Sequence, residues 1–238
     1  MIEIRNLTKR FPGILAVDNI SFATVPGEVF GLLGPNGAGK TTTLRMILTI
    51  LTPTSGTIRV DGIDVRQDSR AARSRIGCVL EDNGLYERLT AEENVAFFGR
   101  LYGLSPDRIR ARTRELFAAL EMTDFAQRRA GTFSKGMKQK TVIARALVAE
   151  PPLLIMDEPT AGLDVPTQRT ILTLLKSYRE KGRTILYSTH IMSEAEEICD
   201  RVAIIDHGRI RAVGAPAELK QRTSESNLQD VFLRLIEA

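Results

Sequence analysis

Cysteine is scarce in this chain of 238 residues, where only Cys78 and Cys199 occur. Each lies among apolar residues, and the two are not arranged at the spacing of a metal site. This scarcity argues against a disulfide-stabilised secreted domain and against a zinc module. We predict that both cysteines are buried, reduced thiols of a cytosolic protein.

Long hydrophobic runs are also missing. No stretch approaches the about 18 consecutive apolar residues that a helix needs to cross a bilayer. The first five residues, Met-Ile-Glu-Ile-Arg, lack the basic and then apolar layout of a signal peptide. We therefore expect the chain to be made in the cytosol and to stay there, so that any membrane part of its function comes from another polypeptide.

Repeats, low-complexity segments and long linkers do not interrupt the chain. Hydrophobic residues make up 43% and charged residues 26%, which is an ordinary balance for a globular α/β domain. The net charge of +4 suits a nucleotide, a nucleic acid or an anionic lipid without choosing among them. The arginine runs at residues 70–75 and 108–114 could contact anionic lipid or a coupling helix of a partner, but a solvated helix face is the ordinary interpretation. We predict no nucleic-acid partner.

Short apolar runs bounded by turn residues recur at residues 29–33, 76–80, 153–156, 184–187 and 202–205. Continuous runs of this kind are typical of strands buried on both faces, as in a parallel sheet covered by helices. Two hairpins are predicted as well. One spans residues 57–65 around Asp61-Gly62, and the other spans residues 202–213.

The middle of the chain has a helical pattern. Between residues 90 and 150 the strand signal fades, and Ser105-Pro106-Asp107 is a typical helix start. Apolar residues that follow it then fall on one face of the predicted helix: Ile109, Leu116, Phe117 and Leu120. Residues 227–236 predict one more amphipathic helix.

A glycine-rich turn follows the run at residues 29–33 and precedes a predicted helix at residues 42–50. It fits the pattern G-x-x-x-x-G-K-[ST] and consists of Gly34, Pro35, Asn36, Gly37, Ala38, Gly39, Lys40 and Thr41, with Thr42 next. Its glycines let successive N–H groups point at phosphates, and the helix N-terminus adds a positive dipole. Lys40 would bridge the β- and γ-phosphates and Thr41 would bind Mg²⁺. We therefore predict a site for ATP and Mg²⁺ made by these residues, although the bare pattern also fits a simple strand-to-helix turn.

The fold class follows from these segments. We predict an α/β protein with a P-loop NTPase core, a mostly parallel sheet and an antiparallel β portion near the N-terminus. A helical lobe at about residues 84–150 would be inserted into this core. The nucleotide-binding domain would take up residues 1–220, and residues 221–238 would form a helical tail.

Two carboxylates end the apolar run at residues 153–156. Asp157 would hold Mg²⁺, and Glu158 would act as the general base that polarises the attacking water, which is the arrangement called Walker B. A solvated acidic turn is the ordinary alternative. Downstream, His190 follows the run at residues 184–187, where it would sense the γ-phosphate and orient the water, although a lone histidine is often structural.

The order and spacing of these residues resemble the nucleotide-binding domain of ATP-binding-cassette (ABC) transporters over nearly the whole chain. The discriminating segment is Phe-Ser-Lys-Gly-Met at residues 133–137, which resembles the family signature L-S-G-G-Q. The resemblance implies that Ser134 and Gly136, at the start of a predicted helix over residues 137–149, bind the γ-phosphate of ATP held by a second subunit. Two ATP molecules would thus join a head-to-tail dimer, which we expect to be a homodimer.

Other positions match the family pattern in the same way. Phe11 matches the aromatic residue that stacks on adenine, although a core role beside Pro12-Gly13 is an alternative. Asp164 ends a segment, residues 161–164, that matches the D-loop through which the subunits contact one another. His190 matches the switch histidine.

The chain departs from the family pattern at the signature and at the Q-loop. Lys135 replaces the first signature glycine, and Met137 replaces the glutamine. Glu81 stands where the family has the glutamine that contacts Mg²⁺ and links hydrolysis to the membrane partner. A carboxylate can still bind Mg²⁺, but without the metal it would repel the γ-phosphate. We hypothesise that Glu81 makes assembly more strictly dependent on Mg²⁺.

Residues 84–90, 97–103, 193–197 and 228–235 resemble the subset of the family that drives two-component exporters, including sodium-efflux and antibiotic-efflux systems. The resemblance implies an integral-membrane permease as partner, export as the direction, and a location at the cytoplasmic face of the membrane. Two alternatives remain at this stage. One is a soluble ABC ATPase of translation or DNA repair, and the other is an inactive regulatory nucleotide-binding module.

Overall fold

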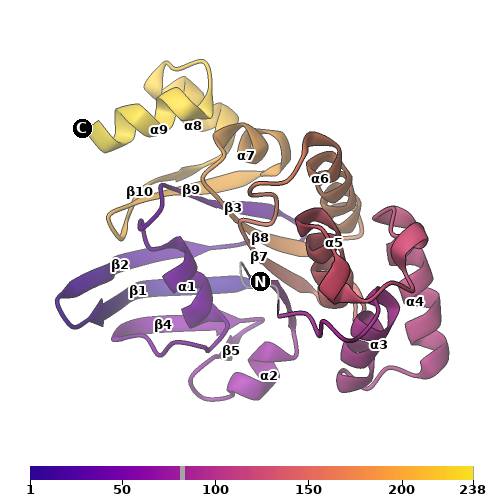
Figure 1. The fold of residues 1–238 in the computed structure, drawn as a ribbon. Coiled ribbons are helices and arrows are strands. Elements are labelled where there is room, and N and C mark those ends of the chain that lie inside the picture. Colours follow the sequence, from indigo (N-terminus) through magenta and orange to yellow (C-terminus); the bar gives the residue numbers. More distant parts are fainter. Residues whose placement is uncertain (81–83, 238) are drawn as a thin grey trace.

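The computed structural model describes residues 1–80 and 84–237 of the chain. Two sheets and a set of helices make up this part (Figure 1). The larger sheet has six strands in the order β10-β9-β3-β8-β7-β6. Their bounds are β3 (Val29–Leu33), β6 (Ile76–Val79), β7 (Leu153–Asp157), β8 (Thr184–Thr189), β9 (Arg201–Asp206) and β10 (Arg209–Gly214).

The larger sheet is parallel from β6 to β9, and only β10 runs antiparallel to its neighbour. All residues of β3, β7 and β8 are buried, as expected for strands covered on both faces. In the register of β7 and β8, Asp157 is paired with Ser188. Two carboxyl ends therefore meet at one edge of the sheet, which is where ligands bind in open α/β sheets.

The smaller sheet is antiparallel, with the order β2-β1-β4-β5. It comprises β1 (Ile2–Phe11), β2 (Ile14–Ala23), β4 (Ser55–Val60) and β5 (Ile63–Asp64). The turn between β4 and β5 places Asp61 and Gly62 at positive φ, so the hairpin expected there is present. The predicted mostly parallel core with an antiparallel β portion near the N-terminus is confirmed.

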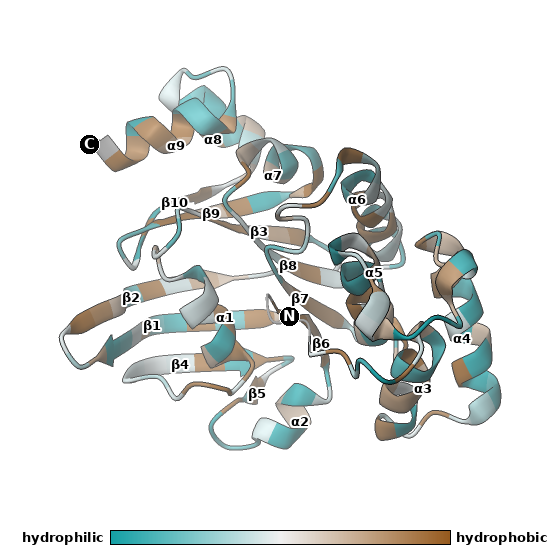
Figure 2. Cartoon of the chain, viewed as in Figure 1, coloured by the Kyte–Doolittle hydropathy of each residue, from teal (hydrophilic) through white to brown (hydrophobic). Residues whose placement is uncertain are grey.

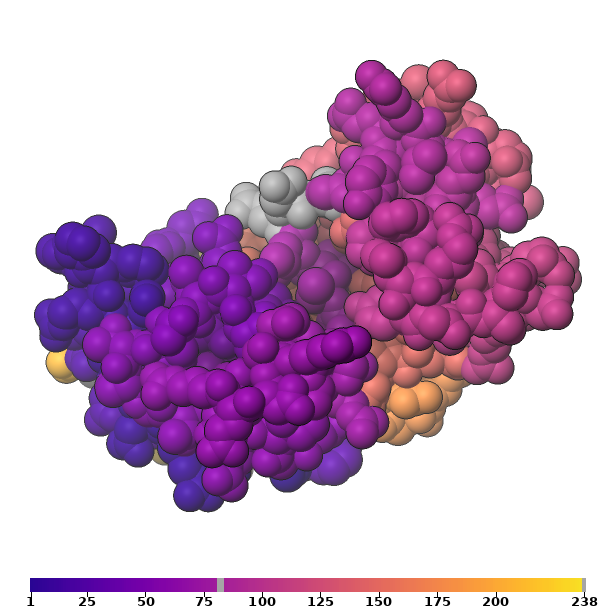
Figure 3. Space-filling view, turned by 90° about the horizontal axis from the view of Figure 1, so that it is seen from below, coloured from indigo at the N-terminus to yellow at the C-terminus, as the bar shows by residue number. Residues whose placement is uncertain are grey.

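Helices surround the larger sheet and form a lobe at one end of the molecule. They are α1 (Lys40–Ile47), α2 (Ser69–Arg73), α3 (Ala91–Leu101), α4 (Pro106–Ala119), α5 (Lys135–Leu147), α6 (Val165–Glu180), α7 (Met192–Ile198), α8 (Pro216–Thr223) and α9 (Leu228–Glu237), with short 3₁₀ turns at Thr123–Phe125 and Ala130–Thr132. Helices α3, α4 and α5 contact one another. From below, the magenta part of this lobe stands beside the indigo and purple β portion (Figure 3).

Side-chain caps explain where the lobe helices begin. Ser105 caps α4 by accepting a hydrogen bond from the backbone N–H of Arg108, and Thr90 and Glu93 form a capping box at α3. Ile109, Leu116 and Phe117 are buried on α4, as their spacing predicts. Arg112 differs from expectation, because it lies on that same buried face and pairs with Glu150 (Nη1 to Oε1, 3.5 Å) instead of facing solvent.

Two hydrophobic clusters stabilise these layers. One fills the space between the larger sheet and helices α3 to α7, and the other fills the space between the two sheets and α1. The central strand β7 is coloured largely brown, as expected for a strand covered on both sides (Figure 2). Burial of this apolar surface contributes roughly 25 cal/mol per Å² to folding.

The C-terminal helices α8 and α9 pack against each other, and α9 also contacts α7 and β10. None of the helices in residues 1–80 and 84–237 combines the length and apolar composition needed to cross a bilayer.

The expectation that both cysteines are buried is half wrong. Cys199 is buried, but Cys78 is exposed. Within the described residues β6 pairs with β7 alone, so it is the edge strand of the larger sheet. The apolar run at residues 76–80 indicates a buried strand, but an apolar run cannot reveal which strand lies at the edge.

Candidate nucleotide site

The P-loop connects β3 to α1, and its backbone can be made only with glycine at two positions. Gly39 has a φ of +105°, and a Cβ there would come within 2.5 Å of the carbonyl oxygen of Ala16. A Cβ at Gly34 would lie 2.1 Å from the carbonyl oxygen of Ile205. The loop is therefore packed closely between β2 and β9. Its last backbone N–H groups lie at the N-terminus of α1.

A cleft with a volume of about 320 Å³ opens above this loop. Most of its lining consists of residues that the sequence predicts for ATP and Mg²⁺. The lining residues are Ala16, Asn36, Gly37, Gly39, Lys40, Thr41, Thr42, Asp157 and Glu158. Ala16 was missed by the sequence analysis, because a small apolar residue in a strand carries no signal of a ligand site.

Lys40 is the central cation of the cleft. Its side chain is only 4% exposed. The ammonium donates hydrogen bonds to the carbonyl oxygens of Gly34 at 2.8 Å and Pro35 at 3.1 Å, and it lies 3.3 Å from Oε1 of Glu158. A buried cation needs such partners, and a phosphate group entering the cleft could replace the carboxylate as the anionic one.

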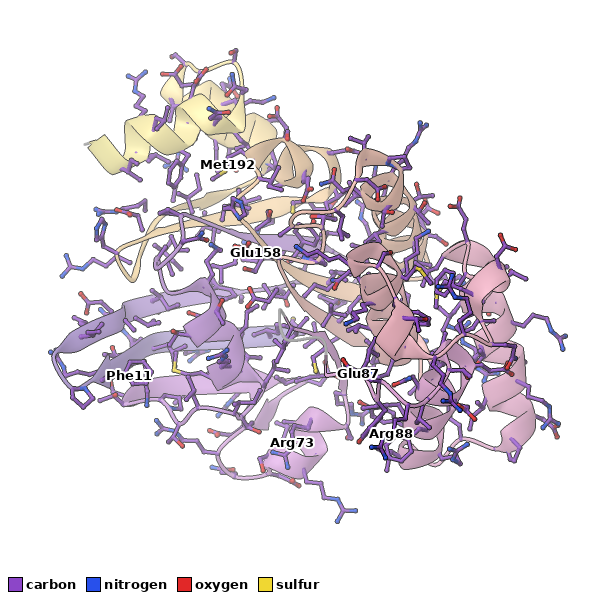
Figure 4. All side chains as sticks on the ribbon, viewed as in Figure 1. Phe11, Arg73, Glu87, Arg88, Glu158 and Met192 are labelled. Carbon is purple, nitrogen blue, oxygen red and sulfur yellow. The ribbon has the colours of Figure 1, made fainter. Side chains whose placement is uncertain are left out.

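Glu158 holds the position from which a base could act. It has a backbone φ of +46°, which is unusual for a residue other than glycine. Its backbone N–H donates to the carbonyl oxygen of Ser188 at 2.9 Å, and its Oε2 lies 2.9 Å from Nδ1 of His190. Figure 4 places Glu158 near the middle of the molecule. The structure thus brings together three residues that lie far apart in the sequence, Lys40, Glu158 and His190.

Asp157 has the properties expected of an Mg²⁺ ligand. It is 2% exposed, and its Oδ1 is buried with no hydrogen-bond partner in the described residues. No group of three or more His, Cys, Asp or Glu side chains forms a metal site among those residues. Mg²⁺ is commonly held by one or two protein oxygens together with substrate phosphates, so the pair Thr41 and Asp157 fits it. Glu81, the third predicted ligand, lies outside the described residues.

Ser134 and Gly136 do not line this cleft, and they lie at the start of α5. Ser134 is exposed and caps the helix, since its Oγ accepts a hydrogen bond from the backbone N–H of Met137 at 3.3 Å. A Cβ at Gly136 would meet Oγ1 of Thr167 at 3.3 Å. The predicted contact of Ser134 with a nucleotide thus needs a second subunit.

Phe11 and Asp164 also lie outside the lining of the cleft. Phe11 lies at the end of β1, away from Glu158 (Figure 4), with the ammonium of Lys9 4.9 Å from the centre of its ring. Asp164 caps α6, and its Oδ1 accepts a hydrogen bond from the backbone N–H of Thr167 at 2.8 Å. This backbone hydrogen bond lowers the pKa of the Asp164 carboxyl group.

Comparison with known proteins agrees with this geometry. Residues 17–161 match the family model described as ABC transporter. The chain is 41% identical to the ABC transporter ATP-binding protein NatA of Bacillus subtilis (strain 168), covering 98% of this chain and 97% of that protein. It is 45% identical to the Nod factor export ATP-binding protein I of Paraburkholderia xenovorans (strain LB400), over 92% of this chain and 72% of that one.

A solved structure shares the fold as well. It is a dimeric post-hydrolysis state of the ATP-binding cassette MJ0796 bound to ADP and Pi, with a TM-score of 0.83 and 30% identity over 90% of this chain and 98% of that one. The family match covers the P-loop, Asp157 and Glu158, which are the residues that meet in the cleft. The chain therefore belongs to the family of ATP-binding subunits of ABC transporters, which bind ATP with Mg²⁺ and hydrolyse it.

Proposed function

We propose that this chain is the ATP-hydrolysing subunit of an exporter and works as a homodimer beneath a separate integral-membrane permease. The observation that carries the proposal is the contact of Glu158 with both Lys40 and His190, at 3.3 and 2.9 Å, at the mouth of the P-loop cleft. A base, a cation and a histidine gathered in this way are the groups that phosphoryl transfer to water requires.

Each residue of the cleft has a distinct role in this proposal. The backbone N–H groups of residues 36–42 and the ammonium of Lys40 bind the triphosphate. Once phosphate oxygens replace its carboxylate as the partner of Lys40, Glu158 is free to accept a proton from the attacking water. His190, which contacts the other oxygen of that carboxylate, holds its orientation and senses the γ-phosphate. Thr41 and Asp157 would hold Mg²⁺, which would supply positive charge beside the phosphate oxygens.

The second subunit completes the site. Ser134 and Gly136 are accessible at the N-terminus of α5, where the helix dipole attracts anions. Phe11 would stack on adenine, and Asp164 would lie at the contact between the two subunits. MJ0796 was solved as a dimer bound to ADP and Pi, which supports the same assembly for this chain. ATP binding would then favour the closed dimer, and hydrolysis would reset it.

Export and a location at the cytoplasmic face of the membrane complete the proposal. Support comes from the relative named for Nod factor export and from the predicted likeness to two-component exporters. We also propose the division into a nucleotide-binding domain of residues 1–220, with a helical lobe at about 84–150, and a tail of residues 221–238. The gathering of Lys40, Glu158 and His190 argues against an inactive regulatory module.

The proposal is tested with the Glu158→Gln variant. ATP and Mg²⁺ should convert this variant from monomer to a stable dimer, measured by light scattering after size exclusion, because the nucleotide is bound and hydrolysed slowly. The same measurement on Glu158→Gln combined with Ser134→Ala should give less dimer. A variant that stays monomeric at saturating ATP would refute the composite site.

A further inference from the structure

A buried polar cluster lies behind the nucleotide cleft. It consists of Thr160, Tyr187 and Glu194, which are 1%, 0% and 7% exposed. Oε2 of Glu194 accepts hydrogen bonds from Oγ1 of Thr160 at 2.6 Å and from the hydroxyl of Tyr187 at 2.8 Å. The two hydroxyl oxygens are 3.1 Å apart. None of the three residues lines the cleft above the P-loop.

The cluster joins the two segments that carry the reactive residues. Tyr187 belongs to β8, which leads into His190, and Glu194 belongs to α7, which follows His190. Thr160 follows Glu158 and precedes the segment at residues 161–164. The loop with His190 is thus tied on both of its sides to the loop with Glu158, and the contact of 2.9 Å between His190 and Glu158 spans the same two loops.

Burial of the Glu194 carboxyl group costs folding free energy, and packing alone does not explain why this residue is buried. Its Oε1 is buried with no hydrogen-bond partner in the part of the chain that the structure describes, and no ion pair with a cation is present there. Burial raises the pKa of Tyr187 well above its usual value, so the phenol keeps its proton and acts as a donor. Burying a carboxyl group without a cation costs free energy, and hydrogen bonds to only one of its oxygens offset that cost in part. Its presence here therefore points to a role beyond packing.

We propose that Glu194 is a positioning residue that holds His190 at hydrogen-bonding distance from Glu158. It acts by accepting hydrogen bonds from the hydroxyl groups of Thr160 and Tyr187 on one oxygen, Oε2. This inference rests on the proposed function, because it assigns Glu194 a role through His190. What matters is one acceptor oxygen at the place of Oε2, and a negative charge is not required.

The first test separates the acceptor from the charge. Glu194→Met removes the acceptor at similar size, and we expect kcat for ATP hydrolysis to fall about tenfold or more, while KM changes less than about twofold, because misplacement of a catalytic group acts on the chemical step. Glu194→Gln keeps an acceptor oxygen and should restore kcat to within about twofold of the wild type. Glu197→Met, on the exposed side of the same helix, is the matched control and should leave kcat unchanged.

The second test asks whether Glu194 acts through His190. In a double-mutant cycle, Glu194→Met should slow His190→Ala only slightly further, because the residue that it positions is already gone. Losses that multiply in full would overturn the proposal, since Glu194 would then serve the fold in general. A kcat for Glu194→Gln as low as that of Glu194→Met would overturn it too, because charge and not the acceptor would be the cause.

The hydroxyl donors offer a milder route if Glu194→Met folds poorly. Thr160→Val should lower kcat and Thr160→Ser should restore it, while Tyr187→Phe should lower kcat at nearly unchanged packing. Wild-type kcat in Thr160→Val and Tyr187→Phe would refute the role of the cluster. If His190→Ala itself hydrolyses ATP at the wild-type rate, the assignment of His190 falls as well; slow hydrolysis by His190→Ala beside wild-type hydrolysis by Glu194→Met overturns the role of Glu194 alone.

Discussion

The ammonium of Lys40 lies 3.3 Å from Oε1 of Glu158, so the predicted phosphate-binding cation and the proposed base form an ion pair with each other. In the proposed site, a nucleotide would compete with the Glu158 carboxylate for Lys40. The ion pair between Lys40 and Glu158 should therefore affect the free energy of nucleotide binding as well as the rate of hydrolysis.

Glu158→Gln should raise the affinity for ADP because this competition is removed. We expect a gain of about three- to tenfold, equivalent to about 1 kcal/mol. ADP is the suitable ligand because its β-phosphate would reach Lys40 and because it has no γ-phosphate to be hydrolysed. Isothermal titration with Mg²⁺ gives the affinity. Lys40→Met should lose affinity, and an unchanged or weaker affinity in Glu158→Gln would argue against the competition.

His190→Ala should lower kcat about 10- to 100-fold and leave the affinity for ADP unchanged, because His190 contacts the carboxylate of Glu158 and does not line the cleft. Phosphate release at saturating ATP measures the rate. His207→Ala is the matched control, since that histidine lies in the turn between β9 and β10 beside Asp206. Equal rates for the two variants would remove His190 from the mechanism.

Ser134→Ala should have two separable effects. Loss of the cap of α5 should lower the free energy of unfolding by about 1 kcal/mol, and loss of the hydroxyl should weaken the ATP-dependent dimer of the Glu158→Gln protein. Ser105→Ala removes the corresponding cap of α4 and should lower stability alone. Urea unfolding measures the first effect and light scattering the second. If Ser105→Ala weakened the dimer as much, the effect at Ser134 would be one of stability only.

Acid should loosen the attachment of the C-terminal helices through Glu196. A hydrogen bond from Lys220 lowers the pKa of this carboxyl group, and the backbone N–H of Leu228 adds to the effect. Because the pKa is lower in the folded state than the ordinary value of 4.5, this stabilisation is full above about pH 4.5 and is lost as the pH falls through the folded value. The stability difference between the wild type and Glu196→Gln, measured by urea unfolding, should therefore be constant from pH 7 to 5 and shrink at lower pH. A difference that persists at pH 3 would contradict this linkage.

Glu81→Gln should make ATP-dependent dimerisation less dependent on Mg²⁺. The glutamine amide carries no charge, so it does not repel the γ-phosphate when the metal is absent. Titration of Mg²⁺ against dimer formation in the Glu158→Gln background measures the midpoint, which should move to a lower concentration. Unchanged Mg²⁺ dependence would refute the hypothesis about Glu81.

Several features of this protein could be predicted from short segments of the sequence. The P-loop could be predicted because only glycine can take the backbone positions of Gly34 and Gly39, and the buried strands could be predicted because continuous apolar runs suit a parallel sheet. The start of α4 followed from Ser105-Pro106-Asp107, whereas α5 begins at Lys135, two residues before the predicted start at residue 137. These features depend on residues that are close together in the sequence.

Strand order and side-chain packing decided the rest. Glu158 meets His190 because β7 pairs with β8, and no local pattern states that pairing. Cys78 is exposed because β6 is an edge strand, and Glu194 is buried because α7 packs over Thr160 and Tyr187. The sequence alone thus predicted candidate reactive groups, since each has its own local pattern. The contacts that hold these groups in place join distant segments and exist only once the sheet has formed.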